Sequence, residues 1–74
     1  MDKNKILITL GKNLRAERNR VGLSQDELAE KTGICAGKHI GTIERGETNP
    51  SIITIISIMK ALDISFDKLF DEIK

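Results

Sequence analysis

The fold of this chain is decided by the stretch Ser24–Gly33, which reads SQDELAEKTG. Ser24 and Glu27 have the spacing of a capping box, in which each side chain accepts a hydrogen bond from the backbone amide of the other residue. A helix is therefore predicted to begin here, with Leu28 and Ala29 on its inner side and Gly33 at its end. The small side chain of Ala29 lets a second helix cross this one closely.

The second helix is expected around Ile40 and Ile43, which lie on its inner side, and Gly46 closes it. Two short helices joined by a turn that contains glycine form a helix-turn-helix unit, here at about residues 24–46. The major groove of DNA is wide enough to admit one helix. The side chains on the outer face of this helix are therefore the candidates for contacts with base edges: Lys38, His39 and Thr42.

The residues before this unit predict a long helix from about Asn4 to Arg20, which Gly22 ends. Its apolar residues at helical spacing are Ile6, Leu7, Leu10, Leu14 and Val21. Gly11 lies on the same face as Leu7 and Leu14, where the absence of a side chain would let a neighbouring helix approach closely.

The residues after the unit predict two more helices, the first capped by Ser51 and the second by Ser65. The β-branched residues of the first would also suit a strand, but its apolar stripe has the helical period. That stripe is Ile52, Ile55, Ile56, Met59 and Leu62. The stripe of the second is Phe66, Leu69, Phe70 and Ile73. We therefore predict an all-α, compact five-helix fold with residues 1–74 in a single domain.

The composition excludes several classes of protein. The chain has 74 residues and one cysteine, so it has no internal disulfide, and this fits a reducing cytoplasm. No apolar run approaches the roughly 20 residues that a membrane span needs, and a cytoplasmic location is expected. With one histidine and no glycine-rich phosphate loop, we expect no enzyme, no cofactor, no metal site and no small-molecule substrate.

The net charge is only +1, but the charges are unevenly distributed. Basic residues gather in the first part of the chain: Lys3, Lys5, Lys12, Arg15, Arg18 and Arg20. A small protein can therefore present a positive face to DNA phosphates while it stays nearly neutral overall.

Separate motifs occur in order between Lys12 and Phe70, over about four-fifths of the chain. They are Leu14-Arg15 and Arg18, the segment 22–29, Thr32-Gly33-Ile34, the segment 43–46, Asn49-Pro50-Ser51, the segment 61–65, and Leu69-Phe70. Together they resemble the phage-repressor-type helix-turn-helix family, also known as the Cro/repressor or XRE-like domain. The resemblance implies a lambda-repressor-like five-helix DNA-binding domain that binds double-stranded operator DNA as a homodimer.

The resemblance also implies roles for single residues. Gln25 opens the second helix, where similar proteins set a glutamine against a DNA phosphate, and the amides of Ser24 and Gln25 suit an anion in any case. Asn49 falls in a loop that resembles the family's backbone-contacting loop. Arg45 either reaches a phosphate or caps the C-terminus of its helix.

Other positions have structural roles in the resemblance. Arg18 and Glu44 match a pair that such domains use as an internal ion pair. The apolar residues of the last helix are candidates for a dimer interface, although some of them must first close the core: Phe66, Leu69, Phe70 and Ile73. We interpret the lone Cys35 as a small buried side chain rather than a redox or ligand sensor.

One departure from the family pattern concerns the helix expected to enter the groove. Relatives place its inner apolar residues six and nine positions after the turn glycine, whereas Ile40 and Ile43 lie seven and ten positions after Gly33. In one alternative the turn is longer by one residue, and the helix starts at Ala36 or Gly37. In the other the turn keeps its shape and the helix rotates by roughly 100°, which would misplace Ile40.

The sequence therefore predicts a transcriptional regulator, a repressor or autoregulator, that binds a palindromic operator. Half-sites would repeat every 10 base pairs or so. A phage-like repressor, a restriction–modification controller and an antitoxin-type regulator all fit. The alternative is a protein-interaction module, such as an antitoxin-type protein that binds a partner and for which DNA is secondary. Strongly salt-dependent binding to one duplex would distinguish the first reading from the second.

Overall fold

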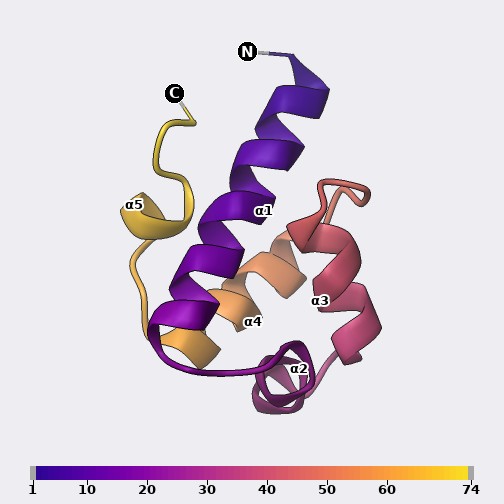
Figure 1. The fold of residues 1–74 in the computed structure, drawn as a ribbon, viewed down its shortest axis with the longest axis vertical. Helices are drawn as coiled ribbons and strands as arrows, with labels where there is room; N and C mark the ends of the chain where they lie inside the picture. The colour runs from indigo at the N-terminus through magenta and orange to yellow at the C-terminus, as the bar shows by residue number, and fades with distance from the viewer. Residues whose placement is uncertain (1, 74) are drawn as a thin grey trace.

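The computed structural model describes residues 2–73, and every regular element within them is a helix. The helices are α1 (Lys3–Arg20), α2 (Gln25–Thr32), α3 (Gly37–Glu44), α4 (Ile52–Leu62) and α5 (Phe66–Leu69). In Figure 1 the long helix α1 runs through the middle, with α4 crossing behind it and α3 and α5 on opposite sides. The prediction of an all-α, five-helix fold is confirmed. Among the described residues, no helix has the length and apolar character needed to cross a membrane.

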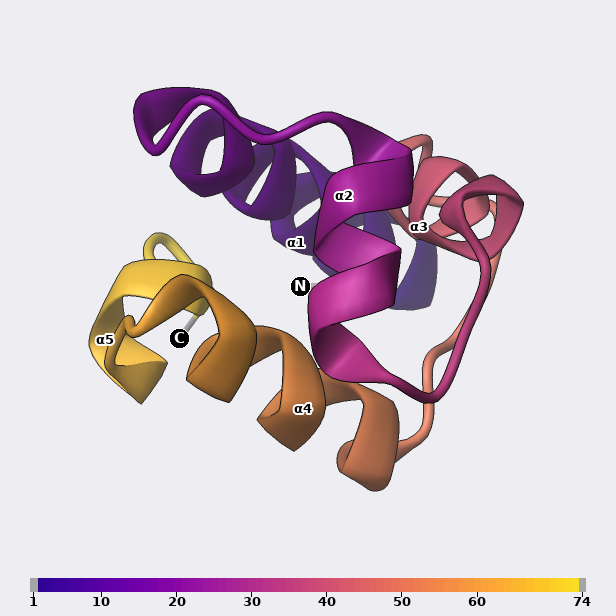
Figure 2. The same ribbon diagram turned by 90° about the horizontal axis from the view of Figure 1, so that it is seen from below.

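The helices share one apolar core. α1 packs against α3 and α5, and α2 packs against α3 and α4. Seen from below, α2 stands between α3 and α4 (Figure 2). Each helix contributes at least one fully buried side chain: Leu14, Leu28, Ile40, Ile43, Ile58 and Leu69. Because burying one such side chain stabilises a fold by roughly 1.5–3 kcal/mol, α3 is part of the structural core and is not an appendage.

The ends of α1 and α2 follow from their sequences. The Ser24 hydroxyl accepts from the Glu27 amide at 3.0 Å, and the Glu27 carboxylate accepts from the Ser24 amide at 2.8 Å. The hydrogen bond from the Ser24 backbone amide, together with the Ser24 side chain, lowers the pKa of the Glu27 carboxyl group. Gly33 ends α2 in the left-handed conformation with φ of 71°. The capping box and the glycine stop are confirmed, whereas the cap of α1 by Asp2, which accepts from the Lys5 amide, was not predicted.

The predicted inner face of α4 is wrong in part. Ile52 is 66% exposed and Ile56 is 41% exposed. The buried residues are Thr54, Ile55, Ile58 and Leu62. Isoleucines occupy nearly every side of this helix, so the packing of α2 against it, and not the periodicity, selects the buried face. The Thr54 hydroxyl tolerates burial because it pairs with the hydroxyl of the cap residue Ser51 at 3.0 Å.

The last helix is shorter than its apolar repeat predicts. α5 ends at Leu69, and the Ser65 side chain that precedes it makes no capping hydrogen bond. The amide of Asn13 on α1 instead donates to the carbonyl oxygens of Leu69 at 2.9 Å and Asp71 at 2.7 Å. Because Asn13 of α1 donates to these carbonyl oxygens, the segment that follows α5 is held against α1 without a longer helix.

The surplus residue lies in the turn before α3. Ala36 is the N-cap residue and Gly37 is the first helical residue, while Ile40 and Ile43 remain fully buried. The longer-turn alternative is therefore correct, and a rotated helix is excluded. A Cβ atom on Gly37 would lie 2.9 Å from Cα of Asp26 and would overlap the Asp26 carboxylate. Glycine thus lets the start of α3 rest directly against the first turn of α2.

Gly11 marks a second close approach, between α1 and α3. A Cβ atom on Gly11 would lie 2.5 Å from the carbonyl oxygen of Ile43 and would overlap that of Glu44. The close contact predicted from the position of Gly11 is therefore present. The C-terminal turn of α3 lies directly on α1.

An ion pair joins the same two helices. Nε of Arg18 lies 2.6 Å from one oxygen of Glu44, and its Nη2 lies 3.0 Å from the other. Nη1 donates to the carbonyl oxygen of Leu23 at 2.7 Å. The hydrogen bonds to Glu44 raise the pKa of Arg18. The Glu44 side chain is only 4% exposed, so its charge depends on these partners.

The Gly11 contact leads to a stability prediction. We expect Gly11→Ala to lower the free energy of unfolding by about 1–3 kcal/mol, because α1 and α3 must separate, even though alanine favours a helix. Urea unfolding followed by circular dichroism measures the change. The matched control is Gly41→Ala in α3, whose Cβ would meet only the side-chain ends of Arg45 and Gln25, at 3.1 and 3.2 Å. That control should change stability by less than about 1 kcal/mol. Equal effects of the two substitutions would contradict the close-packing argument.

The ion pair leads to a second prediction. Arg18→Met should lower the free energy of unfolding by about 3–5 kcal/mol, because it leaves the buried Glu44 carboxylate without its cation. Removing both charges with Arg18→Met and Glu44→Leu should recover much of that loss. The same urea experiment tests both variants. A double variant less stable than Arg18→Met alone would refute this account.

Candidate nucleic-acid interface

The outer side of α3 carries the residues that the sequence assigned to base contacts. Lys38 is exposed, and His39 and Thr42 are half-buried. Lys38 and Thr42 lie one turn apart on the side of the helix away from Ile40 and Ile43, whereas His39 lies one turn before Ile43, at the flank of that side. α3 lies at the edge of the molecule in both views (Figures 1 and 2). The Thr42 hydroxyl donates to the carbonyl oxygen of His39 at 2.8 Å. The three side chains therefore share one accessible surface on a well-formed helix.

Gln25 and Ser24 differ in the donors they can offer to a phosphate. The Gln25 side chain donates one amide hydrogen to the Glu44 carboxylate at 3.1 Å, and a carboxamide has a second hydrogen to give. The Ser24 amide, in contrast, is already bound by the carboxylate of Glu27. Of these two candidates, the side chain of Gln25 is the one placed to donate to an anion.

Arg45 and Asn49 lie beyond the end of α3. Arg45 is its C-cap residue, and the Arg45 Nε lies 3.1 Å from a carboxylate oxygen of Glu47. Both side chains are exposed, and an ion pair of this kind contributes little to stability, so the guanidinium can exchange partners readily. Asn49 is exposed in the segment that leads to α4.

A shallow hollow of 390 Å³ lies on the outer face of α3. It is lined by Ala36, Lys38, His39, Thr42 and Thr48. Sequence reasoning did not place Ala36 or Thr48 on this surface, because one comes from the turn before α3 and the other from the segment after it. Gly46, with φ of 73°, turns the chain after α3. The Glu47 amide then donates to the carbonyl oxygen of Thr42 at 3.0 Å, which brings Thr48 beside the helix.

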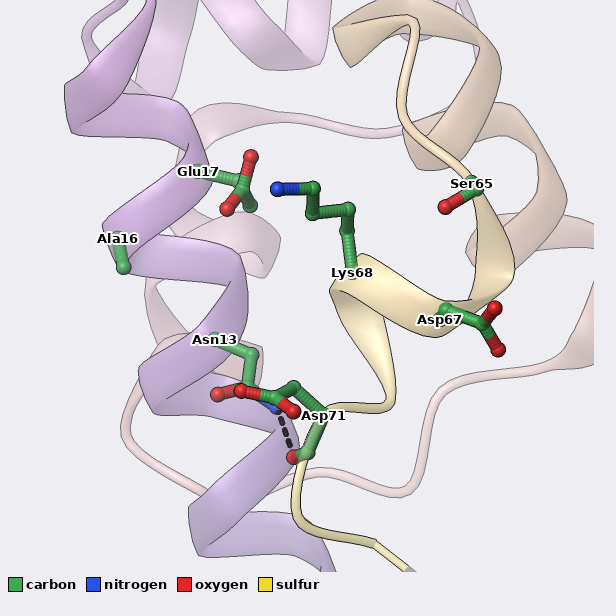
Figure 3. Close-up of a pocket in the computed structure, with 7 residues that line it drawn as sticks. All are labelled: Asn13, Ala16, Glu17, Ser65, Asp67, Lys68 and Asp71. Carbon is green, nitrogen blue, oxygen red and sulfur yellow. Dashed lines mark hydrogen bonds between the residues drawn. The ribbon is translucent and has the colours of Figure 1, made fainter.

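A larger cavity of 540 Å³ lies between α1 and the segment around α5 (Figure 3). Carboxylates of Glu17, Asp67 and Asp71 line it, and Lys68 is the cation among its lining residues. This excess of negative charge disfavours DNA phosphates. The size of a cavity does not therefore identify the nucleic-acid interface in this molecule.

The four candidate dimer residues are in different environments. Leu69 is fully buried in the core of its own chain. Phe66 is 57% exposed and stacks on Phe70, with ring centroids 4.2 Å apart. Phe70 and Ile73 are half-buried. Of the four, Phe66 offers the most apolar surface to a partner.

Known proteins resemble this chain in sequence and in structure. Residues 14–69 match the family described as helix-turn-helix. The chain is 43% identical over 60 residues to the control protein C.SmaI of Serratia marcescens, covering 81% of this chain and 70% of that protein. It is 39% identical over 64 residues to the transcriptional regulator SinR of Bacillus subtilis, covering 85% of this chain and 57% of SinR.

Solved structures support the same relationship. The restriction–modification controller protein C.AhdI of Aeromonas hydrophila superposes with a TM-score of 0.81 at 39% identity, over 86% of this chain and 96% of that one. The controller C.Esp1396I, solved as a tetramer with its natural 35-base-pair operator, superposes with a TM-score of 0.78 at 29% identity, over 89% and 86%. With its capped α2, glycine turn and packed α3, this chain belongs to the helix-turn-helix family of transcriptional regulators.

Proposed function

We propose that this protein is a sequence-specific DNA-binding regulator of transcription, which inserts α3 into the major groove of a palindromic operator as a homodimer. The observation that supports this most strongly is the state of α3. Despite the surplus residue in its turn, α3 keeps Ile40 and Ile43 buried and Lys38 exposed. The helix thus retains the two faces that groove binding requires.

The proposed contacts are of two kinds. Lys38, His39 and Thr42 read base edges from the outer face of α3. Gln25, Arg45 and Asn49 hold the DNA backbone, which fixes the register of the protein but carries no sequence information. Ser24 supports these contacts indirectly, because its capping box fixes the start of α2 beside Gln25.

The expected spacing of operator half-sites supports the proposed homodimer. Two recognition helices must lie about 34 Å apart to enter the major groove at two points that are one turn of the duplex apart. The longest dimension of the described chain is 31 Å, and it carries one α3, so two copies are needed. The tetramer of C.Esp1396I on its operator supports assembly of more than one copy on DNA. We propose that Phe66, with Phe70 and Ile73, provides the contact between copies.

The relatives favour one biological setting. C.SmaI, C.AhdI and C.Esp1396I are all named as control or controller proteins, two of them of restriction–modification systems. We propose that this chain is a controller of the same kind, and that it acts as an autoregulator that binds DNA upstream of its own gene. SinR, which is named only as a transcriptional regulator, fits the broader function.

A footprint on the DNA upstream of the gene tests base reading. We expect Lys38→Ala and His39→Ala to change which sequences are protected while the helical circular dichroism signal stays the same. Loss of Lys38 should weaken binding by about 1–3 kcal/mol if it contacts a base edge. The matched control is Lys60→Ala, which removes an exposed lysine on α4 and should leave the footprint unchanged. Footprints identical to the parent for both α3 variants would refute the proposed reading face.

The dimer contact is tested by sedimentation of purified protein without DNA. Phe66→Ala should weaken self-association roughly tenfold or more and leave the fold intact, because the ring is exposed in the single chain. Ile53→Ala is the matched control, since Ile53 on α4 is exposed to a similar extent. If the Ile53 variant dissociates and the Phe66 variant does not, the contact between copies lies on α4 and our assignment is wrong.

A further inference from the structure

The hollow on the outer face of α3 has an unusual lining for a surface that meets DNA. Its accessible lining, formed by Ala36, Lys38, His39, Thr42 and Thr48, is mostly apolar. The Thr42 hydroxyl donates its hydrogen bond to the carbonyl oxygen of His39 at 2.8 Å. The hydroxyl hydrogen of Thr42 is therefore already used, and the methyl group is the apolar part that this side chain can offer.

The edges of base pairs in the major groove carry one common apolar group, the C5 methyl of thymine. The other groups are hydrogen-bond donors and acceptors, which lose their water without compensation when they meet carbon. Lys38 is one of the residues that line the hollow, and its positive charge attracts the DNA backbone. The hollow therefore matches the thymine methyl group in being apolar, and the positive charge of Lys38 beside it suits a surface that faces DNA.

We propose that this hollow binds the C5 methyl group of one thymine in each operator half-site, so that this base is read through carbon contacts. The inference rests on the proposed function and extends it to the identity of a base. Two separate segments build the hollow around the N-terminal half of α3. Ala36 precedes the helix, and the hydrogen bond from the Glu47 amide to the Thr42 carbonyl holds Thr48 against it.

The test replaces each thymine of an operator half-site in turn by deoxyuridine, which removes the methyl group and keeps the base pair. The operator is the footprinted sequence or, if none is found upstream, a duplex selected from random sequence. We expect one position at which deoxyuridine weakens binding about fourfold, the contribution of one buried methyl group. The remaining thymines should tolerate the replacement.

Protein variants show whether the hollow is responsible. Thr42→Ser keeps the hydroxyl and its bond to His39 but removes the methyl group, so it should abolish the preference for thymine over deoxyuridine. Thr42→Val keeps a methyl group and should preserve that preference. The matched control is Thr32→Ser, because the Thr32 hydroxyl donates to the carbonyl oxygen of Ala29 at 2.7 Å in the same i to i−3 manner, outside the hollow. This control should behave like the parent.

Three results would overturn the inference. One is equal binding of thymine and deoxyuridine at every position. Another is a thymine preference that survives Thr42→Ser. The third is a gain on replacing cytosine by 5-methylcytosine with no loss at any thymine, which would assign the hollow to methylated cytosine. Absence of binding to any duplex would instead refute the proposed function itself.

Discussion

The buried carboxylate of Glu44 is the group on which the arrangement of the first three helices depends. It extends from the end of α3 and receives Arg18 from α1 and Gln25 from α2. Removing a carboxylate from water is costly unless charged or polar partners replace the water. Only a packing that brings these two partners to one point meets that requirement. The contacts of Glu44 with Arg18 and Gln25 thus select one orientation of α3 among those that apolar contacts alone would permit.

Two glycine contacts allow this packing by bringing backbones together. At one end of α3, Gly37 rests on the first turn of α2, and at the other end α1 offers Gly11. The surplus residue before α3 is tolerated because it extends a surface turn, where an added residue costs little. The inner face of α3, set by Ile40 and Ile43, is unchanged. An insertion that looks disruptive in the sequence therefore alters the approach to the helix and leaves its orientation intact.

Local signals were sufficient for much of this structure, and the errors have a common cause. The capping box at Ser24 and the glycine stop at Gly33 act within a few residues, so the sequence predicts them directly. The buried face of α4 and the length of α5 depend on what packs against them. Ile52 is exposed because α2 packs against another side of α4. α5 can end at Leu69 because the side chain of Asn13 donates a hydrogen bond to the carbonyl oxygen of Leu69. The hollow was missed because its lining comes from segments on either side of α3.

The negatively lined cleft beside α5 has a consequence for how the molecule meets DNA. It lies on the opposite side of α1 from α3 (Figure 1), which carries the exposed Lys38 near its start and is followed by the exposed Arg45. The carboxylates that line this cleft therefore lie away from the side of the molecule that carries Lys38. On the proposed function, repulsion between these carboxylates and the phosphates disfavours encounters in which this cleft faces the DNA, and more so in dilute buffer than in concentrated salt.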